Sequence, residues 1–558
     1  MRKALAAGVA LIVAFASPAM AQENDCRAVA IVLEEASLTD LLAVPELRSL
    51  AVAGGAALMN DRSDVYQTFV IFDTPQADPT HIPGLCINFI EPFAEPADAG
   101  RELVDGIPHF SDDALLMVVS TSPSAASAAD GDELGSVIAA WGDPDELLAA
   151  SGEPRALTSD STRRAGVVAD VDPAASVAAW LGLPYDTGAP IERTGEPAPL
   201  DLYERYLQQR RLAVPAAAAS WGTMLVFGLV GVLVLALRER VSARTIEVAA
   251  TLAFSLPWLA LGLLVAGHLS TLIIATVIPF LIAFVAVGVV FTRWVAKRRG
   301  TFVALAASGG VILAILAVEA AFGWPAAVTP LAGGGQLDGG RFFGMPNIEI
   351  GIVLGAALFV AHRIRVGTGF LLLAACALVA GSPWTGANFG AGITLFAAAG
   401  LWLAIRRRRR WLVVVLITGV TTAIGMAGIA VMHRYLTDRP THVTAFLEGT
   451  PSLDGIVDRV TGRLGIGWDQ LTDTPLAVIP VVGVLVLLVV VLRPPGAIAA
   501  SFEGHDAWHD AVLVILLASV VAYLANDTGA AALGFGFGFA LSGLLGVSLA
   551  AARGMMRR

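Results

Sequence analysis

The chain has 558 residues, of which 56% are hydrophobic and only 15% are charged, and its mean hydropathy is +0.72. A soluble domain is about 45–50% apolar and about 25% charged, so the composition excludes a wholly soluble enzyme. The formal net charge is −11, and the basic residues form only one short run. That balance argues against nucleic acid as a partner.

The N-terminus has the pattern of a secretion signal. Arg2 and Lys3 precede an apolar stretch at 4–16, and Ala19-Met20-Ala21 fits the small-x-small cleavage pattern. We therefore expect a signal peptide at 1–21. An uncleaved anchor is the alternative, but the apolar run is short for a membrane span.

Export would place the next segment in an oxidising compartment, where disulfides persist. Cys26 and Cys86 are the cysteines of this segment, so we predict a disulfide between them. The third cysteine, Cys376, lies in an apolar run and is expected to be packed and inert.

Residues 22–200 are predicted to form an extracytoplasmic α/β domain, and 201–212 a charged linker. Apolar runs at 27–33 and 114–119 are typical of buried strands, and 44–53 has a helical pattern that ends in two glycines. A third apolar run at 166–168 is followed, after Asp172, by a helix to Leu181. Ligands of such domains bind at the carboxyl ends of the strands.

These segments resemble the alkaline phosphatase superfamily. AIVLEE followed by PELRSLAVAGG is similar to that family's first strand, metal-ligand turn and following helix. LLMVVSTSPS is similar to its strand before the metal-binding Asp-His pair, and LTSDSTRRAGVVADVDPAASVAAWLGLP to its closing strand and helix. The resemblance covers roughly 28–60 and 112–184, and it implies a truncated fold of that type.

The family's chemistry needs two metals held by Asp and His, which stabilise the attacking and leaving oxygens. Glu34 could stand for the first ligand, but Ser120-Thr121-Ser122 replaces the Asp-His pair. We therefore expect a non-catalytic module with no metal and no cofactor, and we assign no catalytic residue. The alternative is a metal site formed by Glu34, Asp160 and Asp172. Thr68 is the only candidate nucleophile, and the histidines of this domain are His81 and His109.

From residue 213 onward, apolar runs alternate with short polar loops, and we predict an all-α bundle of about eleven transmembrane helices at 213–558. Three segments, beginning at 350, 367 and 390, are short for a bilayer that needs about 20 residues. The predicted spans are 213–237, 246–266, 269–292, 302–323, 350–364, 367–381, 390–405, 411–432, 476–492, 510–525 and 530–552.

Basic residues gather in every second loop of this topology, as the positive-inside rule requires of cytoplasmic loops. The pattern predicts a plasma-membrane protein with its N-terminal domain outside and its C-terminus in the cytoplasm. The arginine run 406–410 is interpreted as a topology anchor. The basic residues are Arg238, Arg240, Arg244, Arg293, Lys297, Arg298, Arg299, Arg363, Arg365, Arg406 to Arg410, Arg493, Arg553, Arg557 and Arg558.

Three glycine-rich polar segments, 333–349, 381–390 and 526–529, interrupt the apolar half on the predicted outer face. Polar groups at membrane depth usually indicate a functional site. The alternative is that these segments are ordinary turns, because Gly, Pro and Asn are common turn residues. We predict one shared cavity for an anionic substrate, with Glu319 facing it as well. The predicted binding residues are Asp338, Arg341, Asn347, Glu349, Asn388 and Asp527.

The pattern GRFFGMPNIE…GANFGAG…NDTG behind such an ectodomain resembles a group of uncharacterised multi-pass membrane proteins, mainly from actinobacteria. The resemblance covers most of 329–400, the loop around 439–442, and 520–535. It implies no activity. The segment 433–475 reads as an interfacial helix or a lid.

His505 and His509 have i, i+4 spacing beside two aspartates, and we expect a solvated loop there rather than a metal site.

Two classes of function remain, and protein partners are not identified. The first is an envelope protein that binds, moves or organises an anionic lipid-linked or polymeric substrate. The second is a membrane-embedded transferase or hydrolase that uses a carboxylate as acid or base. A transporter is a third hypothesis. The near absence of ionisable residues at mid-membrane argues against it.

Overall fold

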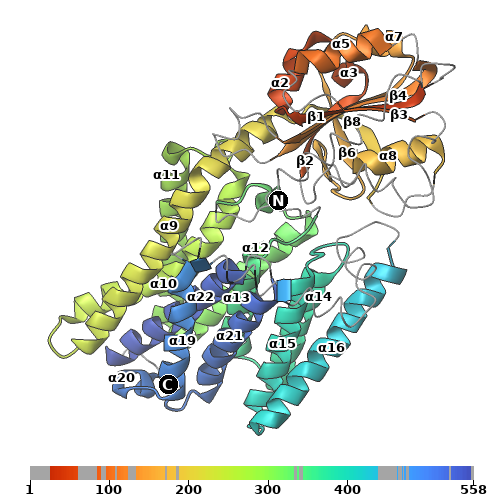
Figure 1. The fold of residues 1–558 in the computed structure, drawn as a ribbon. Coiled ribbons are helices and arrows are strands. Elements are labelled where there is room, and N and C mark those ends of the chain that lie inside the picture. Colours follow the sequence, from red (N-terminus) through yellow and green to blue (C-terminus); the bar gives the residue numbers. More distant parts are fainter. Residues whose placement is uncertain are drawn as a thin grey trace. The chain divides into compact units, whose positions relative to one another are not determined.

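A computed structural model places the chain in two compact units, Met1–Leu207 and Gln208–Arg558 (Figure 1). The division falls inside the predicted linker. Each unit is described by itself. The structure describes residues 26–60, 85–89, 96–106, 110–122, 134–169, 172–183, 188–331, 336–337, 343–437, 461–462, 465, 468, 471–472, 477–526 and 529–553. The predicted signal peptide lies outside these residues and stays a prediction.

The first unit is an α/β domain built on a mixed sheet of eight strands. Its order is β3-β1-β4-β5-β2-β6-β8, and β7 pairs with β2. β3, β1 and β4 are parallel, whereas β5 runs antiparallel to both β4 and β2. The strands are β1 (Cys26–Glu35), β2 (Gly55–Asn60), β3 (Leu85–Phe89), β4 (Phe110–Ser122), β5 (Gly135–Gly142), β6 (Arg155–Ser159), β7 (Val167–Ala169) and β8 (Ile191–Pro197).

Helices cover both faces of this sheet, which is why β1 and β4 are apolar without alternation. Ala28, Ala30 and Val32 of β1 join the core that includes Val177 of α8 (Asp172–Leu181). The intervening side chains point to the opposite face, because direction alternates along a strand. Figure 1 shows that face covered by α2 (Leu38–Ala43), α3 (Pro45–Ala53), α5 (Pro96–Gly106) and α7 (Pro144–Leu148).

The α/β class of this unit is as predicted, but several elements were missed. The strand expected at 114–119 extends over Phe110–Ser122, and the helix expected at 44–53 is α3, preceded by α2. β2 begins at the glycine pair that was expected only to end that helix. β3, β5, β6 and β8 had no counterpart in the prediction.

The parallel register of β1 and β3 bears on the predicted disulfide. Cys86 lies opposite Val29, three residues along β1 from Cys26. Three residues of strand span about 10 Å, whereas bridged cysteines have Cα atoms within about 7 Å. The side chains of both cysteines lie outside what is described, so the disulfide stays a prediction, and forming it would need a shift of this register. Cys376 is a free thiol.

The second unit is largely helical, and each of the eleven predicted apolar segments falls on a helix. The helices are α9 (Leu200–Ala236), α10 (Ala243–Val265), α11 (Ile274–Arg299), α12 (Thr301–Ala321), α13 (Glu349–Ala361), α14 (Val366–Gly381), α15 (Phe389–Arg406), α16 (Trp411–Tyr435), α19 (Val478–Leu492), α20 (Gly496–Phe502), α21 (Asp506–Ala525) and α22 (Gly529–Ala552). Short 3-10 turns, η3 (Ala266–His268) and η4 (Pro325–Val328), follow α10 and α12.

Fewer than eleven of these helices have spanning length. Among the described residues, eight are long and apolar enough to cross a membrane, and a ninth if α19 and α20, bent by 72°, form one span. α13 and α14 have only 13 and 16 residues. A helix rises 1.5 Å per residue, so neither alone reaches across about 30 Å of hydrocarbon.

α22 lies at the centre of the helical unit, packed against α10, α13 and α21. Its glycines allow close approach, as at Gly546, where a Cβ would meet the ring of Phe254 at 2.2 Å. By contrast, α11 and α16 carry exposed rows of valine, isoleucine and leucine. Such faces suit a hydrocarbon solvent, in agreement with a multi-pass membrane protein.

Candidate functional site

Asn388 joins two of the three glycine-rich segments. It is the N-cap of α15, and its Oδ1 accepts a hydrogen bond from the N–H of Ala391 at 2.9 Å. Its Nδ2 donates to the carbonyl of Met345 at 2.9 Å and to Oδ1 of Asn347 at 3.2 Å. Both asparagines are buried. The structure therefore brings two of the predicted binding residues into direct contact.

Glycine makes this contact between the segments close. The N–H of Met345 donates to the carbonyl of Gly386 at 2.8 Å. A Cβ on Gly344 would lie 2.0 Å from that same oxygen, and Gly344 has φ +99°. Both the distance and the dihedral require glycine.

The third segment reaches the same helix end. Asn526 follows α21 and donates from Nδ2 to the carbonyl of Ala522 at 2.8 Å. Its Oδ1 lies against Gly390, where a Cβ would be only 2.0 Å away. Asn526 is thus close to the N-terminus of α15, which Asn388 caps. It was not among the predicted binding residues, although its segment was.

Glu349 begins α13 and is fully buried. A carboxylate in the first turn interacts favourably with the N–H groups exposed at a helix N-terminus. Asp338, Arg341 and Asp527 lie outside the described residues, and their roles stay predictions.

Glu319, near the end of α12, pairs with a histidine that the prediction did not include. Its Oε1 lies 2.5 Å from Nε2 of His268, and its Oε2 accepts from the N–H of Ala326 at 3.1 Å. The carboxylate is 7% exposed and the imidazole 46%. The sequence signal for His268 was its place as an ionisable residue directly after an apolar run.

Trp324 and Gln336 connect this pair to the asparagines. Trp324 donates from its backbone N–H to the carbonyl of Glu319 and from Nε1 to that of Thr385, each at 2.7 Å. Gln336 donates from Nε2 to the carbonyl of Gly344 at 2.7 Å. These hydrogen bonds therefore form one region, at the end of the helical unit where α15 begins. We call it the polar layer: His268, Glu319, Gln336, Asn347, Glu349, Asn388 and Asn526.

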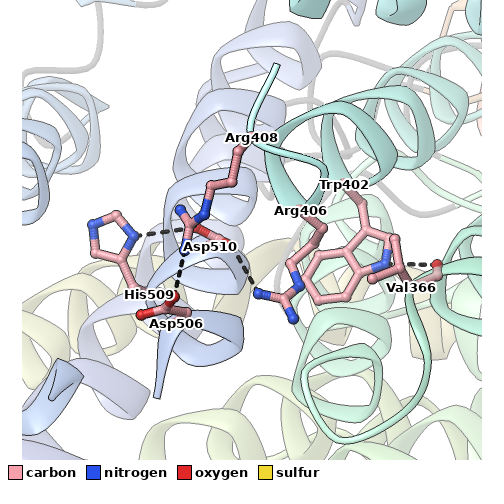
Figure 2. Close-up of polar contacts among 7 residues, drawn as sticks. All are labelled: Val366, Trp402, Arg406, Arg408, Asp506, His509 and Asp510. Carbon is pink, nitrogen blue, oxygen red and sulfur yellow. Dashed lines mark hydrogen bonds and ion pairs between the residues drawn. The ribbon is translucent and has the colours of Figure 1, made fainter. Parts of the chain in front are cut away.

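A second polar cluster lies at the other end of α15 and α21 (Figure 2). Asp510 is completely buried, and its two carboxylate oxygens accept from Arg406 at 3.0 Å and Arg408 at 3.1 Å. His509 approaches the same carboxylate at 3.3 Å, and Arg408 also pairs with Asp506 at 2.8 Å.

We call these five residues the Asp510 cluster. They lie near the start of α21, at the end of α15 and in the turn after it, so the prediction of a solvated loop around His509 was wrong. A buried carboxylate between two guanidinium groups is an interhelical contact. Two members of the arginine run therefore have a structural role as well as a basic charge.

The first unit gives no support to a phosphatase centre. Ser120, which was expected in place of a metal ligand, accepts a hydrogen bond on Oγ from the N–H of Ala36 at 2.8 Å and so fixes the turn after β1. In the part of the chain that is described, no three His, Cys, Asp or Glu side chains gather as a metal site would need. The side chain of Glu34, and Thr68, His81 and His109, lie outside it.

Asp172 instead takes part in a network of hydrogen bonds that holds the start of α8. It is buried at the start of α8 and accepts from Ser159 at 2.5 Å, Ser161 at 2.8 Å, and the N–H groups of Ala169 at 2.7 Å and Ala189 at 3.0 Å. Burial raises the pKa of this carboxyl to about 6, and the four donors oppose that rise. Asp160 is exposed.

Comparison with known proteins adds no relative to this description. No family model, no curated protein and no solved structure matches the chain.

Proposed function

We propose that the protein is a multi-pass component of a bacterial cell envelope that binds, moves or organises an anionic lipid-linked or polymeric substrate at its polar layer. The observation that carries the proposal is the contact between Asn388 and Asn347. It joins segments 41 residues apart at the end of an otherwise apolar bundle. Irregular backbone near hydrocarbon is tolerated where protein buries it or where it lines a wet cavity.

The orientation we propose follows from how the turns alternate. The polar layer draws on the turns after α10, α12, α14 and α21. The arginines gather in the turns after α9, α13 and α15 and in the last turn of α11. Under the positive-inside rule the arginine-bearing end faces the cytoplasm. The polar layer and the first unit are then outside the plasma membrane.

For the first unit we propose a non-catalytic domain related to the alkaline phosphatase superfamily. Its parallel strands β3, β1 and β4 and its layered helices support the relationship. The hydrogen bond of Ser120 at the position of a family metal ligand supports the absence of catalysis. A zinc- or manganese-dependent phosphomonoesterase activity that Glu34→Ala abolishes would overturn this part.

The binding proposal is tested with the full chain in lipid nanodiscs and polyprenyl phosphate as the probe. Arg341 is the cation expected to meet the phosphate, because a guanidinium forms paired hydrogen bonds with it. We expect Arg341→Ala to weaken binding by about tenfold or more and Arg341→Lys to weaken it less. Polyprenol without the phosphate is the matched ligand.

Arg434→Ala is the matched variant, because Arg434 is an exposed arginine in the last turn of α16 and outside the polar layer. It should bind the probe as the wild type does. If Arg341→Ala fails to fold while Arg341→Lys binds normally, Arg341 pins two loops together and the anionic-ligand proposal fails. Equal binding of polyprenol and its phosphate would also overturn it.

The pair of Glu319 and His268 favours a second function, a membrane-embedded transferase. A buried carboxylate that orients a half-exposed imidazole is the arrangement of a general base. A transferase would convert a lipid-linked precursor, and His268→Gln would abolish conversion while binding is retained. Binding without turnover under all conditions would leave only the first function.

A further inference from the structure

The arginine run 406–410 divides into two groups that do different things. Arg406 and Arg408 hold the buried carboxylate of Asp510. Arg407, Arg409 and Arg410 are exposed and make no ion pair with any described residue. The five arginines face two carboxylates in the Asp510 cluster, which leaves a formal surplus of three positive charges in one short turn.

The paired arginines fix the backbone from which the exposed ones project. Arg406 and Arg408 are tied to α21 across about a hundred residues of sequence, and Arg408 has φ +51°. The turn between α15 and α16 is therefore anchored to a neighbouring helix. Anchored cations lose less conformational freedom when they bind a ligand than cations on a free loop do.

A neighbouring turn adds another cation. The indole Nε1 of Trp402 donates to the carbonyl of Val366 at 3.1 Å, and the guanidinium of Arg406 lies 5.6 Å from the centre of that indole (Figure 2). Arg365, directly before Val366, is exposed. The N-terminus of α14 thus lies beside the end of α15, and Arg365 extends the positive surface.

Apolar side chains border this surface. Trp411 and Leu412 follow the arginines and are 57% and 86% exposed. Tryptophan is enriched where hydrocarbon meets the headgroups, and arginine clusters beside a membrane helix attract anionic lipids. A free phosphate would use the arginines alone, whereas a phospholipid would use the arginines and this apolar border.

We propose that Arg365, Arg407, Arg409, Arg410, Trp411 and Leu412 form a binding site for an anionic phospholipid. The arginines bind the headgroup phosphate, and the apolar pair contacts the acyl chains. The site lies at the end of α15 opposite the polar layer. Its existence does not depend on what the polar layer binds.

Native mass spectrometry of the full chain tests the proposal. Phosphatidylglycerol and phosphatidylcholine with identical acyl chains are offered at equal concentration. We expect about a hundredfold higher affinity for phosphatidylglycerol. Replacing Arg407, Arg409 and Arg410 together by glutamine should remove that preference, since each arginine near an anionic lipid contributes about fivefold in affinity. The corresponding triple lysine variant should retain most of it.

The matched control removes the same charge elsewhere. Arg238 and Arg240 lie in the turn between α9 and α10, which contains Glu239 and no tryptophan, and Arg244 lies in the first turn of α10. Their triple glutamine variant should keep the preference within about twofold. If both triple variants lose the preference equally, it comes from the overall positive potential of this face and not from the proposed site. If the wild type binds the two lipids with equal affinity, there is no selectivity. Either result overturns the proposal.

Two further arms remove the remaining ambiguity. Inorganic phosphate at about 10 mM should leave the bound phosphatidylglycerol in place, and complete displacement would show a phosphate site instead. If the triple glutamine variant cannot be recovered folded, the single variants Arg409→Gln and Arg410→Gln replace it. We expect each of them to lower the affinity for phosphatidylglycerol about fivefold. Unchanged affinity in both would overturn the proposal.

Discussion

Asp172 and Asp510 are both fully buried near the start of a helix, yet their surroundings differ. Asp172 is held by two hydroxyls and two backbone N–H groups, all of them neutral. Asp510 is held by two guanidinium groups. Neutral donors orient a carboxylate, but they do not cancel its charge.

The difference has an energetic meaning. A carboxylate transferred from water to a protein interior loses several kcal/mol of solvation free energy. An opposite charge offsets this loss, whereas hydrogen bonds from neutral donors offset only part of it. The consequence is visible at Asp172, whose pKa is raised by burial despite four donors. We therefore expect the two residues to respond differently to mutation and to pH.

The largest effect is expected from Asp510→Asn. Asparagine keeps the shape, but it has no charge for Arg406 and presents an N–H group to another N–H donor. Breaking one partner of a buried ion pair costs about 3–5 kcal/mol. Because both arginines are partly exposed and can turn towards water, we expect about 3 kcal/mol. Unfolding of the purified chain by dodecyl sulfate in mixed micelles measures it.

Asp506→Asn is the matched control, since Asp506 pairs with Arg408 while its side chain is 73% exposed. Exposed pairs contribute about 0–1 kcal/mol. If both variants lose the same stability, the Asp510 cluster has no special structural role.

The second prediction concerns pH and Asp172. Its pKa rises from 3.8 to about 6 on folding, so the folded state binds the proton more tightly than the unfolded state does. This contribution to stability is complete below about pH 4 and is lost as the pH rises through 6. The difference corresponds to about 3 kcal/mol.

Hydrogen–deuterium exchange of α8 in the full chain, corrected for the intrinsic effect of pH, measures this change. Protection should fall from pH 4 to pH 7, and Asp172→Asn should flatten the profile because no titrating carboxyl remains. Protection that rises with pH over this range would mean that the four donors outweigh burial and that the neutral cluster stabilises the anion.

The third prediction compares these carboxylates with an uncharged cap. Asn388→Ala removes the N-cap of α15 and the hydrogen bonds that Nδ2 of Asn388 donates to the Met345 carbonyl and to Oδ1 of Asn347. A lost cap costs about 1 kcal/mol and the two lost hydrogen bonds about 0.5 kcal/mol each, so we expect about 2 kcal/mol in the same micellar unfolding.

Asn388→Asp separates capping from bridging. Aspartate caps a helix as well as asparagine does, but it cannot donate to the two acceptors. We expect it to be at least as destabilising as alanine. If it behaves like the wild type, only the cap matters, and the contact between the glycine-rich segments carries no energy.

Periodicity and composition predicted the elements whose signal is local. The apolar helices, β1 and β4 were placed because their apolar residues are continuous in sequence. β8, IERTGEP, is an edge strand with one buried residue, and it has no such signal. The place of β5 between β4 and β2 follows from pairing across long loops, which no local pattern contains.

The candidate site was predictable in part for the same reason. Asn388 and Asn347 were found because asparagine beside glycine is unusual within an apolar region. The contact of His268 with Glu319 and the pairing of Asp510 with two arginines were missed, because each depends on a partner far along the chain. The pairing of Asp510 with Arg406 joins residues 104 apart. Sequence alone could show that the charges exist, but not that they meet.

The smallest effect is expected from Ser161→Ala, which tests whether Asp172 is ionised at neutral pH. Ser161 donates its hydroxyl to Oδ1 of Asp172, and the N–H of Ala189 donates to the same oxygen, so the carboxyl stays bonded when the hydroxyl is removed. A hydrogen bond to a charged acceptor contributes about 1.5 kcal/mol or more, and one to a neutral acceptor about 1 kcal/mol. We therefore expect protection of α8 to fall by about 1.5 kcal/mol at pH 7 and by less at pH 4, where the carboxyl is protonated. The same loss at both pH values would mean that the charge of Asp172 does not change between them, and the contrast with Asp510 would then rest on geometry alone.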